Sequence, residues 1–189
     1  MLHYPKMPDS RRASGGRCTA FEKYDGTKLH WEWDRDFGWH SFGARRAAFN
    51  LTESGIAQFA LAHAHLRECA DVFRATLADA LEKVFRDNPN YARFDSTKVF
   101  TEFFVTNSFV GLHKSDDPKR LVLFDVWAEP FGMVGPEPFV ADFGPLGSGV
   151  ARVVYRGKLT GAFVENARTG KYDVAEGVVC KGGAGGPDL

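Results

Sequence analysis

The chain has 189 residues, 44% of them hydrophobic and 25% charged, which is enough for one sizeable core and typical of a globular protein. Its formal net charge is zero, although residues 1–46 hold nine basic against six acidic side chains, and this balance excludes a strongly basic nucleic-acid-binding composition. The 17 phenylalanines favour a strand-rich core with aromatic packing.

The cysteines and the N-terminal sequence indicate the compartment. Cys18, Cys69 and Cys180 are odd in number and far apart, and no Cys-x-x-Cys pair occurs. This pattern argues against a disulfide framework or a zinc site and favours a reducing environment. The first residues contain no signal-peptide core, and no apolar run is long enough to span a bilayer. We therefore expect a soluble cytoplasmic protein.

In chain order, an irregular lead-in over residues 1–19 precedes β-type patterning from Thr19 to Trp33 that is interrupted at Gly26. A turn then leads to a second strand, "WHSFGARRAAF". Thr52 before Glu53 predicts a helix start. Apolar residues recur at three- and four-residue steps from there to position 85, which predicts a core-facing helix or helix pair with a break at "AHAHL" and an end at "DNPN".

The remaining sequence consists of short apolar runs separated by turn-forming segments. We expect strands at "KVFTEFFV", "RLVLFDVWA", "GVARVVYRG", "LTGAFVEN" and "EGVVCK", and loops at "SDDPKR", "GPEP", "DFGPLGSG" and "ARTG". Strands at this spacing after a helical region predict an α+β fold with largely antiparallel sheets. The tail "GGAGGPDL" has the composition of a flexible linker.

Lys23, in "FEKYDG", is the first candidate for chemistry, because a lysine there is either a surface charge at a strand entrance or a nucleophile. A nucleophilic lysine must lose its proton, which requires burial or nearby positive charge to lower its pKa. Gly26, three residues on, would let a phosphate or another chain segment approach closely. Taken alone, this pattern favours a solvated lysine near a turn, since such tetrads are common by chance.

Four segments taken together change this interpretation. "EKYDGTK" (22–28), "FTEFF" (100–104), "LVLFDVW" (121–127) and "EGVVCK" (176–181) occur in that order on predicted strands. They resemble motifs I, III, IIIa and IV of the covalent nucleotidyltransferases, which comprise ATP-dependent RNA and DNA ligases and mRNA capping enzymes. The likeness is closest to the RNA ligase branch and covers nearly the whole chain. It implies one ATP-grasp-like adenylation domain over residues 1–189, in which two packed antiparallel sheets with helices outside hold ATP between them.

The resemblance also implies roles for single residues. Lys23 matches the lysine that attacks the α-phosphate of ATP and becomes adenylylated. Glu176 matches the acid that positions Mg²⁺ or Mn²⁺ and the lysine. The positions that match ATP-binding residues are Glu22 beside the adenine, Arg46 or its neighbour Arg45 at phosphate or ribose, Glu102 at a ribose hydroxyl, Phe124 with Asp125 in the Phe-Asp pair, and Lys181 near the phosphates.

The implied activity joins a 5′-phosphate to a 3′-hydroxyl end of RNA, in a nicked duplex or an RNA/DNA hybrid, by a monomeric enzyme. DNA ligase, capping guanylyltransferase and a non-catalytic nucleotide- or RNA-binding domain remain alternatives. Two departures bear on the choice. Leu121-Val122-Leu123 precedes the Phe-Asp pair where relatives often have an aromatic residue, so Phe124 is either a stacking or a core residue. The Lys-x-Lys strand of motif V is absent, so we expect a fragment of a longer protein with weak or no ligation by itself.

Overall fold

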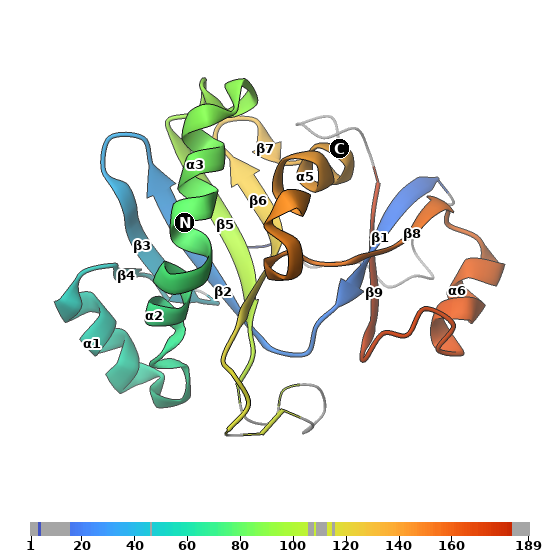
Figure 1. Ribbon diagram of the computed structural model, residues 1–189, viewed down its shortest axis with the longest axis horizontal. Coiled ribbons are helices and arrows are strands. Elements are labelled where there is room, and N and C mark those ends of the chain that lie inside the picture. Colours follow the sequence, from blue (N-terminus) through green and yellow to red (C-terminus); the bar gives the residue numbers. More distant parts are fainter. Residues whose placement is uncertain are drawn as a thin grey trace.

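Two antiparallel sheets form the framework of the protein (Figure 1). The computed structural model describes residues 4, 16–45, 47–105, 108, 113–114 and 116–182. Within this part, the six-stranded sheet has the order β4 (Phe49–Asn50), β3 (Gly38–Ala44), β2 (Thr27–Asp34), β5 (Ser96–Phe103), β6 (Leu121–Ala128) and β7 (Gly132–Met133). The three-stranded sheet has the order β8 (Val153–Lys158), β1 (Arg17–Lys23) and β9 (Gly177–Lys181). The expected α+β class with antiparallel sheets is confirmed.

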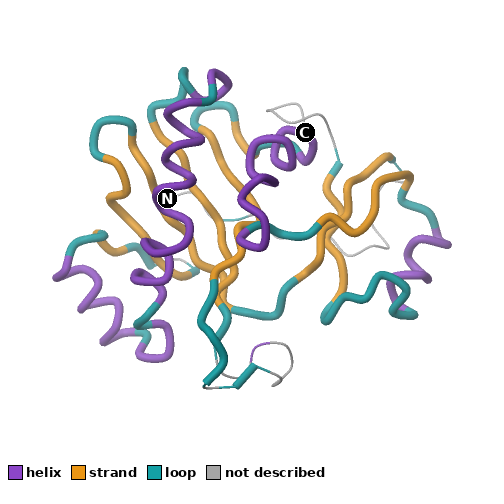
Figure 2. Tube along the Cα trace, in the orientation of Figure 1, coloured by secondary structure: helices purple, strands orange, loops and turns teal. Residues whose placement is uncertain are grey.

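Helices cover one face of the larger sheet (Figure 2). They are α1 (Glu53–Ala62), α2 (Cys69–Phe73), α3 (Asp79–Asp87) and α5 (Pro136–Phe143), while α6 (Gly161–Arg168) packs against the smaller sheet. A single turn of π-helix, η3 (Arg74–Ala78), joins α2 to α3. As a result, the chain from 69 to 87 runs as one long helical segment across the sheet.

Alternating side chains on β2 and β5 explain how the larger sheet is held. Leu29, Trp31 and Trp33 are fully buried and face the helices, where the Trp31 ring stacks on Phe73 with centroids 3.9 Å apart. The Trp31 indole N–H donates to Thr101 Oγ1 at 2.9 Å, which satisfies its one polar atom inside the core. The intervening residues of both strands face the other side of the sheet, and the candidate site lies there.

The helix boundaries predicted from the sequence are confirmed. The Thr52 hydroxyl accepts from the backbone N–H of Gly55 and caps α1. The helix ends at Ala62, and a short 3₁₀ turn, η2 (Ala64–Leu66), occupies the expected break. Helix α3 ends at Asp87, two residues before the proline of "DNPN", because proline is disfavoured inside a helix.

Two predictions for the C-terminal half are wrong. "LTGAFVEN" is helix α6 and not a strand: the Thr160 hydroxyl accepts from the Phe163 N–H at 3.2 Å, and Phe163 packs on Tyr155 with centroids 4.4 Å apart. "GPEP" and the start of "DFGPLGSG" belong to α5, and a 3₁₀ segment, η5 (Gly144–Gly149), follows. Proline is tolerated in a first helical turn, so Pro136 permits the helix, and burial of Phe139 and Phe143 stabilises it.

Two of the three cysteines lie close together in space although they are far apart in the sequence. Cys69 is buried among the helices, whereas Cys18 of β1 and Cys180 of β9 lie on paired strands close enough for their thiols to interact. Burial, with the neighbouring Cys18, raises the pKa of Cys180 to about 12, so the Cys180 thiol stays protonated near neutrality. Among the described residues, no helix is long and apolar enough to cross a membrane.

Candidate functional site

Lys23 lies at the end of β1, next to the start of β9. The two strands pair antiparallel with Lys23 opposite Gly177, so the residue before β9, Glu176, lies beside the lysine. The Lys23 ammonium donates a hydrogen bond to Glu176 Oε1. Both side chains remain partly open to solvent, with exposed fractions of 47% and 31%. Residues 153 positions apart in sequence thus form an accessible ion pair.

Glu102 of β5 lies on the face of the larger sheet that points away from the helices. It is opposite Lys28 of β2, and its Oε1 accepts from the backbone N–H of Gly26 at 3.3 Å. Burial raises the pKa of Glu102 to about 7, and the Gly26 N–H and the charges of Lys23 and Lys28 oppose this shift. The influence of Lys23 on this carboxyl group places Glu102 in the same electrostatic cluster as the Lys23–Glu176 pair.

Lys28 is a member of this cluster that the sequence interpretation missed. Burial lowers the pKa of Lys28, the carboxyl group of Glu102 raises it, and the nearby Arg45 lowers it further. Lys28 is the last residue of the "EKYDGTK" segment. Side chains alternate along a strand, so the apolar Leu29 after it indicates that Lys28 points to the opposite face, which is the face of Glu102.

Gly26 lets the chain between β1 and β2 approach the end of β5. A Cβ atom at this position would lie 2.7 Å from the Phe103 carbonyl oxygen and 2.9 Å from Glu102 Cγ. Both distances are shorter than real contacts of a Cβ atom. The glycine therefore allows the backbone contact that holds Glu102.

Lys181 connects the Phe-Asp pair of β6 to β9. Its ammonium lies 2.9 Å from Asp125 Oδ2 and also donates to the Phe124 carbonyl oxygen. The rings of Phe21 and Phe139, which pack edge-on against each other, lie close to the ammonium, with centroids 4.9 and 5.1 Å from the nitrogen. Burial lowers the pKa of Lys181, and Asp125 opposes this. The Lys181 side chain is only 13% exposed, so the contact that it makes between the two sheets lies in the protein interior.

Tyr4 completes the surroundings of this pair, although the sequence had placed it in an irregular lead-in. Its hydroxyl donates to Asp125 Oδ2 at 2.7 Å, and its ring packs edge-on against Phe124 with centroids 5.2 Å apart. The Lys28 ammonium lies 4.8 Å from the centre of the same ring. Burial, with the charges of Asp125 and Glu102, raises the pKa of Tyr4, so the hydroxyl remains a donor.

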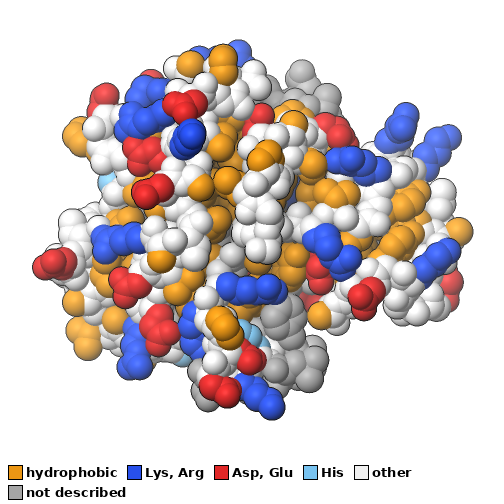
Figure 3. Space-filling model, viewed as in Figure 1, with side chains coloured by type: hydrophobic (Ala, Val, Ile, Leu, Met, Phe, Trp, Pro, Cys, Tyr) orange, Lys and Arg blue, Asp and Glu red, His pale blue; other side chains and the backbone are white. Residues whose placement is uncertain are grey.

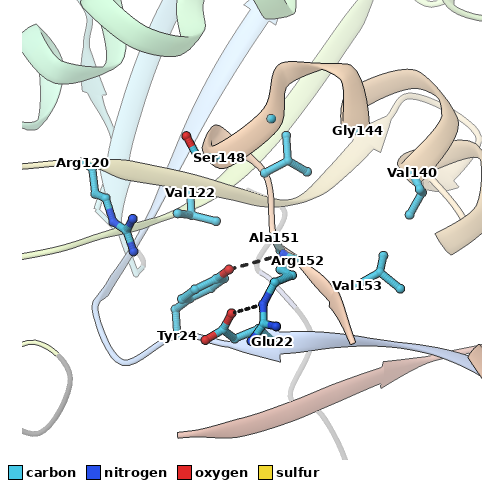
Figure 4. A pocket seen from close by; sticks show the side chains of 12 residues that line it. Glu22, Tyr24, Arg120, Val122, Val140, Gly144, Ser148, Ala151, Arg152 and Val153 are labelled. Atoms are coloured by element: carbon cyan, nitrogen blue, oxygen red, sulfur yellow. Dashed lines mark hydrogen bonds and ion pairs between the residues drawn. The ribbon is translucent and has the colours of Figure 1, made fainter. Parts of the chain in front are cut away.

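Glu22 is not brought to this cluster. Side chains alternate along a strand, so Glu22 points away from the side of Lys23, and its Oε2 accepts from Arg152 Nε at 3.0 Å. Both residues line a separate pocket of about 480 Å³ beneath η5 (Figure 4). Arg152 also donates to the Asp173 carbonyl oxygen at 2.7 Å, and its backbone N–H donates to the Tyr24 hydroxyl at 3.3 Å.

Of the remaining predicted site residues, Arg46 lies outside the described part of the chain. Its alternative, Arg45, is close enough to Lys28 to lower the pKa of that lysine. The structure thus gathers Lys23, Glu176 and Glu102 with Lys28, and it places Phe124, Asp125 and Lys181 together next to them. No protein-family model matches this chain, and no curated protein matches it in sequence.

Proposed function

We propose that the protein is an ATP-dependent nucleotidyltransferase of the RNA ligase type, with Lys23 as the nucleophile. The contact between Lys23 and Glu176 carries the proposal, because a chance lysine near a turn has no reason to meet a distant carboxylate from the segment that resembles motif IV. The cluster of Glu102 and Lys28 beside it supplies the hydrogen-bonding groups and positive charge that a nucleoside triphosphate requires.

In the first step, the unprotonated Lys23 nitrogen attacks the α-phosphorus of ATP. A nitrogen–phosphorus bond forms, the bond from the α-phosphorus to the bridging oxygen breaks, and pyrophosphate leaves with that electron pair. Glu176 accepts a hydrogen bond from the ammonium and is therefore placed to receive its proton. Negative charge grows on the phosphoryl oxygens and the pyrophosphate, and the cations near Lys23 stabilise it.

Glu102 and Lys28 suit the sugar and phosphate groups of the nucleotide. An ionised Glu102 accepts a hydrogen bond from a ribose hydroxyl, and the ammonium of Lys28 binds an adjacent phosphate oxygen. The half-buried Phe124 offers an apolar surface beside them, which favours the stacking interpretation of this residue over a purely internal one.

A divalent cation fits this site through one protein carboxylate. Among the described residues, no group of three or more potential metal ligands occurs. Mg²⁺ commonly keeps several waters and binds through one or two carboxylates together with substrate phosphates, so Glu176 alone is sufficient on the protein side. When bound, the ion would neutralise charge on the leaving phosphates.

In the later steps, AMP passes from Lys23 to a 5′-phosphate end of RNA, and a 3′-hydroxyl then displaces it to form the new phosphodiester bond. The expected products of a full cycle are joined RNA, AMP and pyrophosphate.

Labelling with ATP tests the proposal. Incubation with [α-³²P]ATP and Mg²⁺ should give a covalent adenylate on the wild-type protein and on Lys83→Ala, which removes an exposed lysine of α3, but not on Lys23→Ala. Absence of label on the wild type, or equal label on Lys23→Ala, would contradict the assignment. Preferential labelling with GTP would indicate a capping enzyme, preferential sealing of nicked DNA would indicate a DNA ligase, and ATP binding without labelling would indicate a non-catalytic domain.

A further inference from the structure

The pocket beneath η5 is a cavity apart from the candidate site at Lys23. Its volume of about 480 Å³ is within the range of roughly 300–1,000 Å³ that is typical of sites for small molecules. Glu22 and Tyr24 reach it from the end of β1, whereas Lys23, the residue between them, points to the other side (Figure 4). A ligand of this pocket therefore does not occupy the place that is proposed for ATP.

Small apolar residues form the floor of this pocket. Val122 of β6 and the pair Val150 and Ala151, which follow η5, are buried and line it. Gly144 and Gly147 of η5 also line it and add no side chain. Residues of this size leave the space between β6 and η5 open, so the pocket offers apolar surface on which an apolar group of a ligand gains free energy by leaving water.

The acidic side of the pocket is already neutralised. Among the described lining residues, Glu22 carries the one carboxylate, and its Oε2 accepts from Arg152 Nε at 3.0 Å. Burial raises the pKa of Tyr24, so its hydroxyl is uncharged near neutrality. The ion pair leaves no demand for a cationic ligand on this side.

Arg120 adds a second guanidinium group to the lining. Its backbone is fixed at the start of β6, where its carbonyl oxygen accepts from the Phe104 N–H at 3.1 Å, and its guanidinium carbon lies 4.7 Å from the centre of the Phe104 ring. From there the exposed side chain extends toward Tyr24 (Figure 4). Two arginines against one glutamate give the described lining a net charge of +1.

The pocket thus combines an apolar floor with a cationic rim. Figure 3 shows hydrophobic side chains between Lys and Arg side chains below α5, where the two sheets meet. A guanidinium group presents a planar set of N–H donors that matches a carboxylate or a phosphate. The ligand that fits both features has an apolar body and one anionic group.

We propose that this pocket binds a small organic anion, whose carboxylate or phosphate group contacts Arg120 and whose apolar body lies against Val122 and Val150. The Glu22 carboxylate at the opposite wall repels a second anionic group, so the ligand carries its charge at one end. The inference involves no reaction of Lys23. Failure of the labelling with ATP would therefore leave it standing, and its own failure would leave the proposed function untouched.

Titration of the ¹⁵N-labelled protein at constant ionic strength, followed by amide chemical shifts, tests this site. Phenyl phosphate and phenylacetate carry the two kinds of anionic group on an aromatic ring, and they should shift the amides of Gly147, Ser148 and Arg152 until saturation. Benzyl alcohol lacks the charge and inorganic phosphate lacks the apolar body, so each should bind at least about tenfold more weakly than phenyl phosphate. The anion that binds more tightly identifies the group that the pocket prefers.

Variants of Arg120 separate its charge from its packing. Arg120→Met keeps an apolar chain on the Phe104 ring and should bind both organic anions about tenfold more weakly, with no change for benzyl alcohol. Arg120→Lys keeps the charge and should recover most of the loss. Arg93→Met is the matched control, because Arg93 is also exposed and lies 4.3 Å from the centre of a phenylalanine ring, that of Phe131; it should bind like the wild type.

Four results would each overturn the proposed site. Shifts confined to the amides of Gly26 and Lys28 would place the anions at the candidate nucleotide site. Equal affinity for benzyl alcohol would show that the pocket selects only for apolar surface. Equal affinity of Arg120→Met and the wild type for phenyl phosphate would remove the role of the guanidinium group. Saturable shifts at Gly147 and Ser148 with adenosine, as strong as those with phenyl phosphate, would assign the pocket to an uncharged nucleoside.

Discussion

At the scale of single residues, Glu102 and Gly26 determine each other's position. The Gly26 N–H holds the Glu102 carboxylate, and the missing Cβ of the glycine leaves room for the Glu102 side chain and the Phe103 carbonyl. From the sequence, Gly26 was expected to allow the close approach of either a phosphate or another chain segment. In the structure, another chain segment, the end of β5, makes this close approach.

Substitution of Gly26 by alanine should therefore disturb the site. The new Cβ would clash with the Phe103 carbonyl oxygen, and we expect a loss of about 1–3 kcal/mol in the free energy of unfolding, measured by urea denaturation. Adenylylation should fall as well because Glu102 moves. Gly161→Ala is the matched control: nothing lies within 4 Å of a Cβ there, and alanine favours helix α6. Equal stability of the two variants would contradict this account.

The raised pKa of Glu102 predicts a pH dependence of stability. A carboxyl group whose pKa rises from 4.5 to about 7 on folding binds a proton more tightly in the folded state, so stability falls as pH rises from about 4.5 to 7 and is constant above. Glu102→Gln should remove up to about 3 kcal/mol of this dependence, measured by urea denaturation at pH 5 and pH 8. The exposed Glu165→Gln should leave it unchanged; an unaltered profile in Glu102→Gln would argue against the shift.

The same ionisation should appear in the activity. The ionised Glu102 accepts a stronger, charge-assisted hydrogen bond from a ribose hydroxyl than the protonated carboxyl group does, so the affinity for ATP should rise with pH as the carboxyl loses its proton near pH 7. Titration calorimetry of ATP binding at several pH values measures this, and Glu102→Gln should bind ATP weakly with little pH dependence between 6 and 8. A wild-type affinity that stays constant over that range would oppose the role given to Glu102.

At the scale of elements, the stack of Phe73 on Trp31 fixes the helical segment on the larger sheet. Phe73 is the last residue of α2, directly before the π-helical turn, and it is fully buried against a strand residue far away in sequence. Edge-on contact with Trp39 of β3, at 4.8 Å between centroids, adds a second aromatic partner. The position of this helical segment is therefore set by aromatic packing on two strands.

Phe73→Ala should cost about 3–5 kcal/mol of unfolding free energy, because it removes a large buried ring and leaves a cavity beneath the two tryptophans. Leu61→Ala provides the comparison, since Leu61 of α1 is 88% exposed and its truncation should change stability by less than about 0.5 kcal/mol. Chemical denaturation measures both. A small effect of Phe73→Ala would mean that the helical segment is anchored elsewhere.

At the scale of the whole molecule, the ion pair of Lys181 with Asp125 joins the two sheets. Lys181 belongs to the smaller sheet and Asp125 to the larger one, and both side chains are largely buried, with exposed fractions of 13% and 6%. A buried charge is stable only with its partner and further hydrogen bonds, which Tyr4 and the Phe124 carbonyl provide. The relative position of the sheets, and with it the distance from Lys23 to Glu102, depends on this pair.

Lys181→Met should destabilise the protein by about 3–5 kcal/mol because it leaves Asp125 charged and buried. The double variant Asp125→Asn/Lys181→Met removes both charges and should recover most of that loss, as measured by urea denaturation. Failure of the second substitution to restore stability would show that Lys181 acts through packing on Phe21 and Phe139 and not through its charge.

The sequence by itself determined most of the elements and the residues that are candidates for the site. Period-two and helical patterns predicted β2, β5, β6 and the helices from Thr52 to Asp87, because these signals arise from contacts between near neighbours. Comparison of four short segments singled out Lys23, Glu102, Asp125 and Glu176. The prediction failed at "LTGAFVEN", where the alternation of small and apolar residues is typical of a strand. In the structure this segment is helix α6, which the Thr160 cap and the burial of Phe163 stabilise.

Only the tertiary structure decided which of these residues meet. Strand pairing placed Glu176 on Lys23, put Lys28 and Tyr4 beside the site, directed Glu22 away from it, and brought Cys18 to Cys180. Such contacts depend on register, in which a shift of one residue sends a side chain to the opposite face of a sheet. Register is fixed by packing between segments that lie far apart in the sequence, by 74 residues for Lys28 and Glu102 and by 153 for Lys23 and Glu176, which no local pattern contains.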